Sequence, residues 1–211
     1  IFGGKKLIEV YYYIHVNDAY DVAECGMSLQ KWYDKEIEIG GQKRKFISAF
    51  LNPRDDIEKY RSNDYKCLKM NIPFKDCYIA EKYYYYAGLE NSRAMDLYLK
   101  SIIPVDEYVY GTYRLPECLI GTTILPDRIV IAGTGLDTPV LFNNSEELYI
   151  NNIIELKREE DSSFSDALLY FFYSKLAENN KIDKIENANK KFAVFIDKNG
   201  GKSVIVKIPE I

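Results

Sequence analysis

The sequence predicts an α+β fold, with two small β-sheets packed together and helices around them. Segments rich in β-branched and aromatic residues recur between residues 7 and 131, and such segments are typical of strands. Residues 163–180 place apolar side chains at helical spacing along one stripe, which predicts an amphipathic helix. Two apolar runs then flank Asn199-Gly200-Gly201, and this pattern predicts a β-hairpin over residues 192–208.

The beginning of the chain predicts a strand followed by a short helix. Residues 7–16 form the expected strand, which puts His15 at or near its end. The helix is expected over residues 17–26, with Asp18 as its N-cap and Gly26 at its stop. The histidine therefore lies close to the junction between the two elements.

The middle of the chain alternates between extended and helical patterns. Pro53 restricts the turn that holds Arg54, and Pro116 marks the edge or a bulge of a later extended segment. In chain order, the remaining expected elements are strands at 45–51, 67–73 and 76–80, a helix at 83–100, an extended segment at 108–120, and a strand within 124–131 that is broken at Gly133-Thr134-Gly135.

The sequence predicts one domain made of two segments. Residues 1–134 form the expected core, and residues 135–211 add the helix and the hairpin to the same domain. A chain of 211 residues suits one large core, and its 47% of hydrophobic residues supply enough apolar surface for folding. Disorder is therefore not expected.

Several features favour a cytoplasmic protein without a membrane span. No apolar run approaches the roughly 18 to 20 residues that cross a bilayer, and residues 1–7 lack the pattern of a secretory signal. The four cysteines form no C-x-x-C pair and the chain has one histidine, which argues against a zinc site. Sparse, unpaired cysteines are typical of free thiols in a reducing compartment.

Charge and tyrosine content bear on possible partners. A formal net charge of −4 argues against a surface that binds nucleic acid as a whole, while a local basic groove stays open. The chain has 19 tyrosines, with clusters at residues 11–13 and 83–86. We favour a packing role for these clusters, and the alternative is a surface on which bases stack.

Three segments carry the strongest functional signal. In chain order they are Tyr13-Ile14-His15 with the helix that ends at Gly26, then Phe50-Leu51-Asn52-Pro53-Arg54, and then Arg114 to Ile120 leading into Ile124 to Ile129. This order resembles the DarT-like family of DNA-targeting ADP-ribosyltransferase toxins over about residues 8–130. The resemblance implies a split β-sheet core that holds NAD in a cleft, with NAD as the donor substrate and a nucleic-acid base as a possible acceptor.

The resemblance also implies roles for individual residues. Glu117 is expected to be the catalytic carboxylate, because breaking the bond between nicotinamide and ribose develops positive charge on the sugar. Arg54 would bind the NAD diphosphate or position the acceptor, and His15 would bind the adenosine ribose. The aromatic side chain beside the nicotinamide would come from residues 83–86, with Tyr84 as the candidate. Thymidine, guanosine, a protein or another acceptor all remain open.

Two other functions are consistent with the sequence. Residues 153–157 predict an apolar strand with Glu155 and Lys157, and Asp127 or Asp137 lies upstream. Two carboxylates and a lysine around Mg²⁺ are the centre of PD-(D/E)xK nucleases, although Glu-x-Lys is a short motif. The second alternative is a non-catalytic interaction module that uses its tyrosine clusters as the contact surface.

Overall fold

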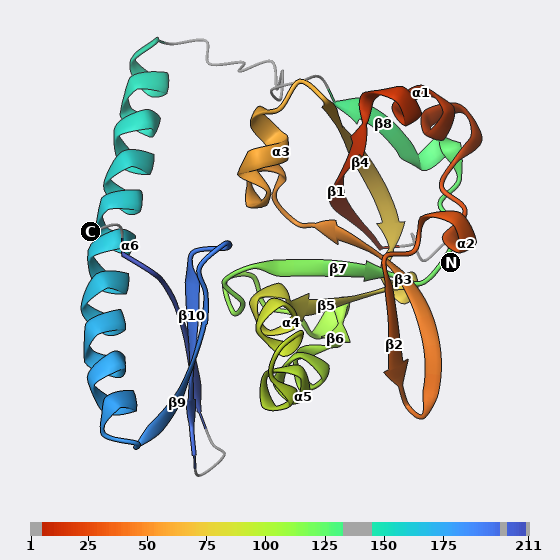
Figure 1. Ribbon diagram of the computed structural model, residues 1–211. Helices are drawn as coiled ribbons and strands as arrows, with labels where there is room; N and C mark the ends of the chain where they lie inside the picture. The colour runs from red at the N-terminus through yellow and green to blue at the C-terminus, as the bar shows by residue number, and fades with distance from the viewer. Residues whose placement is uncertain (1–5, 133–144, 199–201, 210–211) are drawn as a thin grey trace. The chain divides into compact units, whose positions relative to one another are not determined.

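The computed structural model describes residues 6–132, 145–198 and 202–209, and for residues 145–161 it describes the helical backbone alone. The chain forms two compact units (Figure 1). The N-terminal unit comprises residues 1–82 and 98–138, and the C-terminal unit comprises residues 83–97 and 139–211. Both units combine helices and antiparallel strands, so the predicted α+β class is confirmed.

One curled antiparallel sheet organises the N-terminal unit. Its strand order is β6-β5-β7-β3-β1-β4-β8, and β2 pairs with β3 beside this path. Figure 1 shows that β5 and β7 run in a markedly different direction from β1 and β4, so the sheet turns where β3 joins the two groups. The strands are β1 Leu7–His15, β2 Lys35–Ile39, β3 Gln42–Phe50, β4 Tyr65–Pro73, β5 Cys77–Glu81, β6 Ile103–Pro104, β7 Pro116–Ile120 and β8 Ile129–Ala132.

The two faces of this sheet carry different residues because side chains alternate along each strand. One face is the main apolar core, to which Val10, Ala49 and Cys118 belong. On the other face Tyr11 lies opposite Phe50, and Phe50 lies opposite Glu117. Side chains that are directly opposite on paired strands share a face, so these three residues form one row across β1, β3 and β7.

Short helices cover the core face and the strand ends of the N-terminal unit. Helix α1 begins at Val16 and places Ala19 and Val22 in the core. Its N-cap is His15, whose Nδ1 accepts the backbone N–H of Asn17 at 3.3 Å, so the prediction of Asp18 as N-cap was wrong. The helices are α1 Val16–Cys25, α2 Leu29–Trp32 and α3 Ile57–Arg61, with 3₁₀ turns η1 Pro53–Asp55, η2 Phe74–Asp76, η3 Val105–Glu107 and η4 Pro126–Arg128.

The predicted stop of the first helix at Gly26 is confirmed. Gly26 has φ 83° and ψ 178°, a conformation in which residues with a Cβ are strained. A Cβ at this position would lie 2.5 Å from the carbonyl oxygen of Ile124. The backbones of residues 26–27 and 124 therefore approach each other as closely as a glycine permits, and Met27 and Ile124 exchange backbone hydrogen bonds of 2.8 and 2.9 Å.

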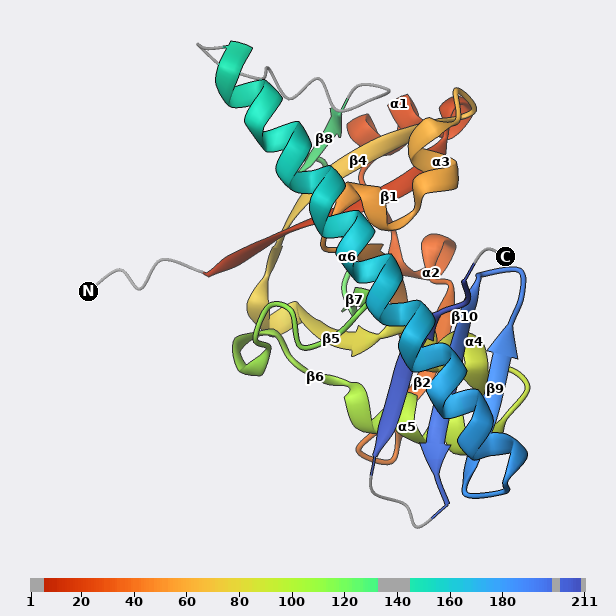
Figure 2. The ribbon, with the colours of Figure 1, turned by 90° about the vertical axis from the view of Figure 1, so that its left-hand side faces the viewer.

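The C-terminal unit is a three-stranded sheet with helices on both faces (Figure 2). On β10, Phe192 and Val194 pack with Ala87 and Ala94 of α4 and α5, whereas Phe195 packs with aromatic residues of α6. The strand order is β11-β10-β9, and the predicted hairpin is confirmed as β10 and β11. The elements are α4 Lys82–Gly88, α5 Ser92–Ser101, α6 Ser145–Glu178, β9 Ile182–Asn187, β10 Phe192–Asp197 and β11 Ser203–Lys207, and the first residue of α4 and the last turn of α5 belong to the N-terminal unit.

Three predicted elements differ in the structure. The helix expected over 83–100 is two helices: α4 ends at Gly88, and Asn91 caps the start of α5, where its Oδ1 accepts the backbone N–H of Ala94 at 3.2 Å. The extended segment expected over 108–120 is a strand only from Pro116, since residues 108–115 form a loop. The strand expected over 153–157 was wrong, because these residues lie within α6. Gly133-Thr134-Gly135 and Asp137 lie outside the described residues.

Candidate active site

Glu117 is the centre of a buried polar cluster in the N-terminal unit. It is the second residue of β7, which lies between β3 and β5, and its side chain is fully buried. Phe50 and Ala80 are its partners on the neighbouring strands. A carboxylate buried among apolar strands is costly unless it is paired, so its partners decide its state.

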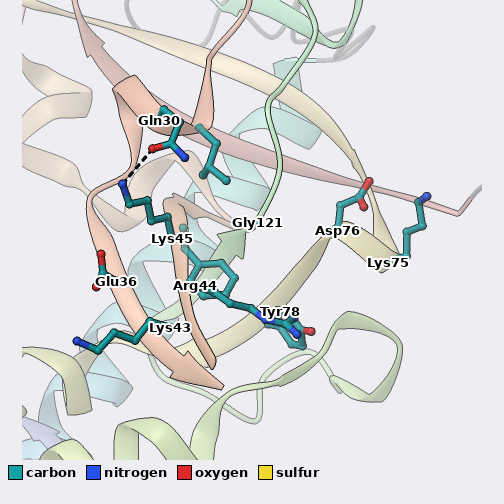
Figure 3. Close-up of a pocket in the computed structure, with 11 residues that line it drawn as sticks. Gln30, Glu36, Lys43, Arg44, Lys45, Lys75, Asp76, Tyr78 and Gly121 are labelled. Carbon is teal, nitrogen blue, oxygen red and sulfur yellow. Dashed lines mark hydrogen bonds between the residues drawn. The ribbon is translucent and has the colours of Figure 1, made fainter. Parts of the chain in front are cut away.

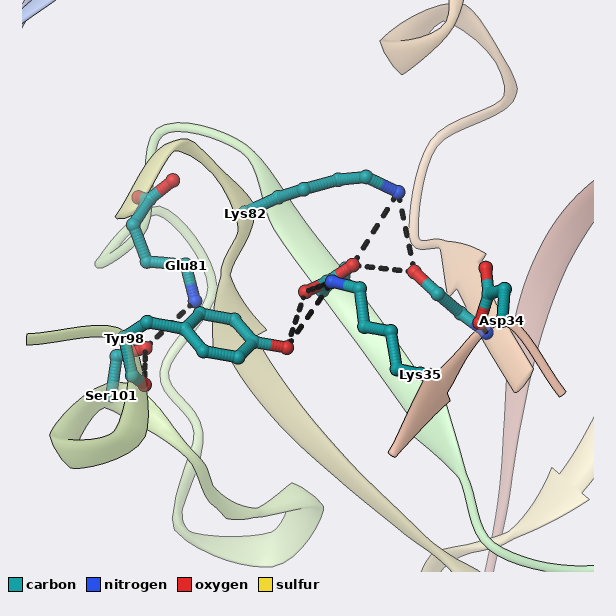
Figure 4. Close-up of polar contacts among 8 residues, drawn as sticks. Asp34, Lys35, Glu81, Lys82, Tyr98 and Ser101 are labelled. Carbon is teal, nitrogen blue, oxygen red and sulfur yellow. Dashed lines mark hydrogen bonds and ion pairs between the residues drawn. The ribbon is translucent and has the colours of Figure 1, made fainter. Parts of the chain in front are cut away.

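Four side chains contact this carboxylate, three through hydrogen bonds and one through an ion pair (Figure 4). Oε1 accepts the Lys35 ammonium at 2.5 Å and the Tyr98 hydroxyl at 2.8 Å. Oε2 accepts the Ser48 hydroxyl, and it forms an ion pair with the Lys82 ammonium at 3.4 Å. These donors come from β2, β3, α4 and α5, so the cluster joins four elements to β7.

The cluster keeps Glu117 ionised. Burial opposes its charge, but the Lys35 and Lys82 ammonium groups and the hydrogen bonds from Lys35 and Ser48 outweigh burial, so the pKa of Glu117 is lowered. Burial also lowers the pKa of Lys35 to about 8, although the attraction of Glu117 opposes this shift. Lys35 therefore titrates much closer to neutrality than an exposed lysine.

A second carboxylate balances the charge of the two lysines. Asp34 attracts both ammonium groups, and its Oδ1 accepts the backbone N–H of Ser48 at 2.9 Å. Two carboxylates thus face two ammonium groups around β3. The opposite charges of the cluster therefore balance one another, as buried charges require.

An aromatic hollow of about 430 Å³ lies beside this cluster in the same unit. It is bordered by β1, by the turn after β3 and by the segment 108–116 that leads into Glu117, three segments that are far apart in the sequence. The Glu117 carboxylate itself does not line the hollow. The lining residues are Tyr11, Leu51, Asn52, Pro53, Asp55, Tyr108, Tyr110, Gly111, Tyr113 and Pro116.

Specific contacts hold the walls of the aromatic hollow. The buried Glu81 carboxylate accepts the backbone N–H groups of Arg114 and Leu115 at 2.6 and 3.2 Å, which fixes the end of the tyrosine-bearing loop. The Tyr113 hydroxyl donates to the carbonyl oxygen of Ser101 at 2.7 Å. Within the hollow, burial raises the pKa of Asp55 to about 6.

The four predicted site residues occupy four different places, and Glu117 is the one in the buried cluster. His15 is exposed on the face that carries Tyr11 and Glu117, and it lies four residues beyond Tyr11, or about 13 Å along β1 at the usual rise per residue. Arg54 is exposed in η1, where the Asn52 side chain accepts its backbone N–H at 2.9 Å. Tyr84 belongs to the C-terminal unit, and its hydroxyl hydrogen-bonds that of Ser203 at 2.6 Å.

A second hollow, of about 510 Å³, is basic (Figure 3). Lys43, Arg44 and Lys45 come from β3, and Lys75 comes from η2. Two of these cations are oriented by uncharged amides, since Lys45 donates to Gln30 at 3.0 Å and Arg44 donates to Gln42 at 3.5 Å. The other lining residues are Leu29, Glu36, Phe46, Asp76, Tyr78 and Gly121.

Other features bear on cofactors and membranes. Across the described parts of the chain, no three His, Cys, Asp or Glu side chains lie close enough to hold a metal ion. The side chains of Glu155 and Lys157 lie outside the described residues. All four cysteines are free thiols, and Cys25 is the exposed one. None of the helices that the structure describes is both long and apolar enough to span a membrane.

Sequence reasoning did not find the partners of Glu117. Lys35, Lys82 and Tyr98 lie between 19 and 82 residues from Glu117 along the chain, so no local pattern connects them to it. The tyrosines at 108, 110 and 113 carried a usable signal, because three aromatic residues lie within six positions around a glycine. Comparison of the chain with models of protein families, with curated proteins and with solved structures gave no match.

Proposed function

We propose that the N-terminal unit is an ADP-ribosyltransferase that binds NAD at the aromatic hollow and transfers ADP-ribose to a nucleic-acid base. The observation that carries this proposal is the meeting of three distant segments. Tyr11 of β1, the turn at Asn52–Asp55 and Pro116 beside Glu117 all border the same hollow. The last two segments belong to the resemblance to the DarT-like family, and β1 is the strand that carries His15 further along. The turned sheet is compatible with a split core.

In the proposed reaction Glu117 acts on the nicotinamide ribose. The bond between C1′ of the ribose and the nicotinamide nitrogen breaks, and nicotinamide leaves with the electron pair. A nucleophilic atom of the acceptor then bonds to C1′ and loses its proton. An ionised carboxylate stabilises the positive charge that develops on the sugar and accepts a hydrogen bond from a ribose hydroxyl. The lowered pKa of Glu117 supports this role.

The positions of His15 and Arg54 suit the two remaining parts of NAD. Because Nδ1 of His15 accepts a hydrogen bond, the neutral ring carries its proton on Nε2, which can donate to an adenosine ribose hydroxyl. His15 shares a sheet face with Glu117 and lies two strands away. Arg54 follows Asn52 and Pro53 of the hollow, and its exposed guanidinium can bind two diphosphate oxygens.

The tyrosines of the hollow are better placed for the nicotinamide than Tyr84. Tyr108, Tyr110 and Tyr113 line the space next to Pro116, and rings of this kind stack on flat heterocycles. Tyr108 already contacts both neighbouring rings, with centroids 5.5 and 5.3 Å apart. We therefore propose the nicotinamide site among these three tyrosines.

The basic hollow supports a nucleic-acid acceptor. Four cationic side chains gather there in a chain whose net charge is −4, so this positive charge is local. Lysine and arginine bind backbone phosphates, and aromatic side chains such as Tyr78 can stack on a base. The hollow thus fits the phosphates of a nucleic-acid strand.

Nicotinamide release and acceptor labelling test the proposal. The full chain is incubated with NAD and single-stranded oligonucleotides, and ADP-ribose is sought by mass spectrometry. Glu117→Gln should abolish the release of nicotinamide, whereas the matched Glu9→Gln, which changes a half-exposed glutamate on β1, should leave it intact. Lys43→Gln and Arg44→Gln should weaken oligonucleotide binding and reduce its salt dependence by roughly 0.7 per lost phosphate contact on a log–log plot.

A non-catalytic binding module is the second candidate. It is favoured by one observation: the Glu117 carboxylate is fully buried and does not line the aromatic hollow. In that case an aromatic ligand would bind among the tyrosines without being cleaved. NAD or oligonucleotide binding that is lost in Tyr110→Ala, with no nicotinamide released by any form of the chain, would establish the module and refute the transferase.

A further inference from the structure

The acceptor positions of the Glu117 carboxylate are fully occupied. An ionised carboxylate offers about four lone-pair positions, two on each oxygen. Lys35 and Tyr98 occupy those of Oε1, and Ser48 and Lys82 occupy those of Oε2. A ribose hydroxyl can therefore bind this carboxylate only if one of the four donors leaves.

Lys82 has the longest contact with the carboxylate among the four donors. Its ammonium lies 3.4 Å from Oε2, whereas the Lys35 ammonium lies 2.5 Å from Oε1. The Lys82 ammonium also donates to the Ser48 hydroxyl at 3.2 Å and lies 4.1 Å from the centre of the Phe50 ring. These two contacts can hold the ammonium when the contact with Oε2 is lost, because a cation is stabilised over an aromatic face.

The position of Lys82 in the chain connects it to the C-terminal unit. The chain leaves the N-terminal unit between Lys82 and Tyr83 and returns to it between Leu97 and Tyr98. At each crossing one residue belongs to the N-terminal unit, and these two residues, Lys82 and Tyr98, both contact the Glu117 carboxylate. Both connections between the units therefore begin or finish at a residue that contacts the Glu117 carboxylate.

The intervening helices are anchored within the C-terminal unit. In α4, the Tyr84 hydroxyl hydrogen-bonds the Ser203 hydroxyl of β11 at 2.6 Å. In α5, Arg93 forms an ion pair with Asp183 of β9 and donates to the carbonyl oxygen of Asp197 at 3.0 Å. A shift of α4 relative to the N-terminal unit must act on Lys82, because Lys82 is the first residue of that helix.

We propose that Lys82 is a positioning residue that gates Glu117: its ammonium caps Oε2 at rest and withdraws to admit a substrate hydroxyl, and helix α4 transmits the state of the C-terminal unit to it. This inference rests on the proposed transferase function. It adds a control point to that function, since the C-terminal unit then sets whether the carboxylate can accept the ribose hydroxyl. Lys35 remains bound to Oε1 in both states and keeps the carboxylate ionised.

Two substitutions of Lys82 test the gate in the full chain, with nicotinamide release as the assay and water as the acceptor. Lys82→Met removes the donor that must be displaced, so kcat/KM for NAD at the plateau of the pH profile should rise about three- to tenfold, the usual worth of one hydrogen bond. The same change removes a cation, which raises the pKa of Glu117 and moves the acidic limb of the profile to higher pH. Lys82→Arg should keep the acidic limb in place, and Lys100→Met, which changes an exposed lysine of the same unit, should match the wild type throughout.

The proposed transmission through α4 is tested by Ser203→Ala, which leaves every group around Glu117 in place. It removes the hydrogen bond between Tyr84 and Ser203 and so loosens α4, and kcat/KM should rise while the acidic limb stays where it is. If Lys82→Met folds but loses activity, and the acidic limb of its pH profile does not move, the gate is overturned. If kcat/KM of Ser203→Ala equals that of the wild type, the transmission through α4 is overturned. A wild-type chain that neither binds nor cleaves NAD overturns the transferase as well, whereas cleavage that depends on Glu117 but ignores Lys82 and Ser203 overturns the gate alone.

Discussion

Burial should make the Lys35–Glu117 ion pair far more strongly coupled than an exposed pair of the same length. The structure supplies both members of this comparison in one unit. Lys35 and Glu117 lie 2.5 Å apart with side chains 5% and 0% exposed, whereas Lys69 and Glu9 lie 2.6 Å apart with side chains 40% and 41% exposed. Distance is thus held nearly constant while the solvent around the pair changes.

The expected magnitudes follow from the environment of each pair. At an effective dielectric constant of about 20, two unit charges 2.5 Å apart attract by roughly 6 to 7 kcal/mol, and desolvation cancels much of this. Removing one partner of a buried pair typically costs about 3–5 kcal/mol, because the other charge is left buried. Lys82 partly compensates for the loss of Lys35 at Glu117. We therefore expect a coupling free energy on the order of 2–3 kcal/mol for the buried pair and about 0–1 kcal/mol for the exposed pair.

Two double-mutant cycles measure these couplings. Lys35→Met, Glu117→Gln and the double variant form the first cycle, and Lys69→Met, Glu9→Gln and their double variant form the second. Urea unfolding of each protein, followed by circular dichroism, gives the change in the free energy of unfolding. Equal couplings in the two cycles would refute the conclusion that Glu117 is held by charge in a buried cluster, and a more stable Lys35→Met single variant would refute it as well.

Three further predictions concern the rest of the N-terminal unit. His15→Ala should lower the free energy of unfolding by about 0.5–2 kcal/mol, because it removes the N-cap of α1. His15→Asn should keep the wild-type stability, because asparagine also caps helices, and should still impair NAD cleavage. An equal loss of stability in both variants would exclude the capping role. Gly26→Ala should cost at least about 1–3 kcal/mol through backbone strain, with the contact to the Ile124 carbonyl adding to it, and a melting temperature equal to that of the wild type would contradict this. Burial raises the pKa of Asp55 from an ordinary value of 3.8 to about 6, so the folded state binds this proton more tightly than the unfolded state and the free energy of unfolding should fall as pH rises between these values. Urea unfolding at several pH values measures this slope, and Asp55→Asn should remove it. A slope that persists in the variant would show that another group causes it.

Much of the strand framework could be predicted because its signals are local. β1, β4 and the hairpin of β10 and β11 consist of β-branched and aromatic residues next to recognisable turns. β2 could have been found in the same way, since Gly40 and Gly41 follow it with φ values of 61° and 77°, as a two-residue hairpin turn requires. In contrast, β9 has the sequence Ile-Asp-Lys-Ile-Glu-Asn, and its pairing with β10 is a tertiary effect.

The misassigned segment at 153–157 shows where pattern alone is insufficient. A run of four or five apolar residues is compatible with a buried strand or with one turn of a helix, and length decides between them. Here the helix runs from Ser145 to Glu178, so the apolar run is a small part of a long element. The proposed nuclease motif depended on that strand, and Glu155 and Lys157 instead lie on α6.

The sequence singles out Glu117 but does not reveal the residues that surround it. Glu117 stood out because a charge among Pro116, Cys118 and Leu119 must be paired or functional. Its donors could not be inferred, since the antiparallel pairing of β3 with β7 and the return of the chain through α5 bring them together. A hydroxyl or ammonium on a distant element leaves no trace in the sequence near its partner.

The buried cluster is itself an argument that Glu117 has a role beyond stability. An ion pair buried in a protein usually contributes no more to stability than apolar residues of similar volume, because desolvation offsets the attraction. Here one carboxylate receives four donors, including two ammonium groups, at the centre of a sheet whose other face is packed with aliphatic side chains. Apolar residues at positions 35, 82 and 117 would fill the same space without that cost. What the charged cluster adds is an ionised carboxylate held in a fixed orientation, with one donor that can move, and these are the properties that the proposed transfer of ADP-ribose requires.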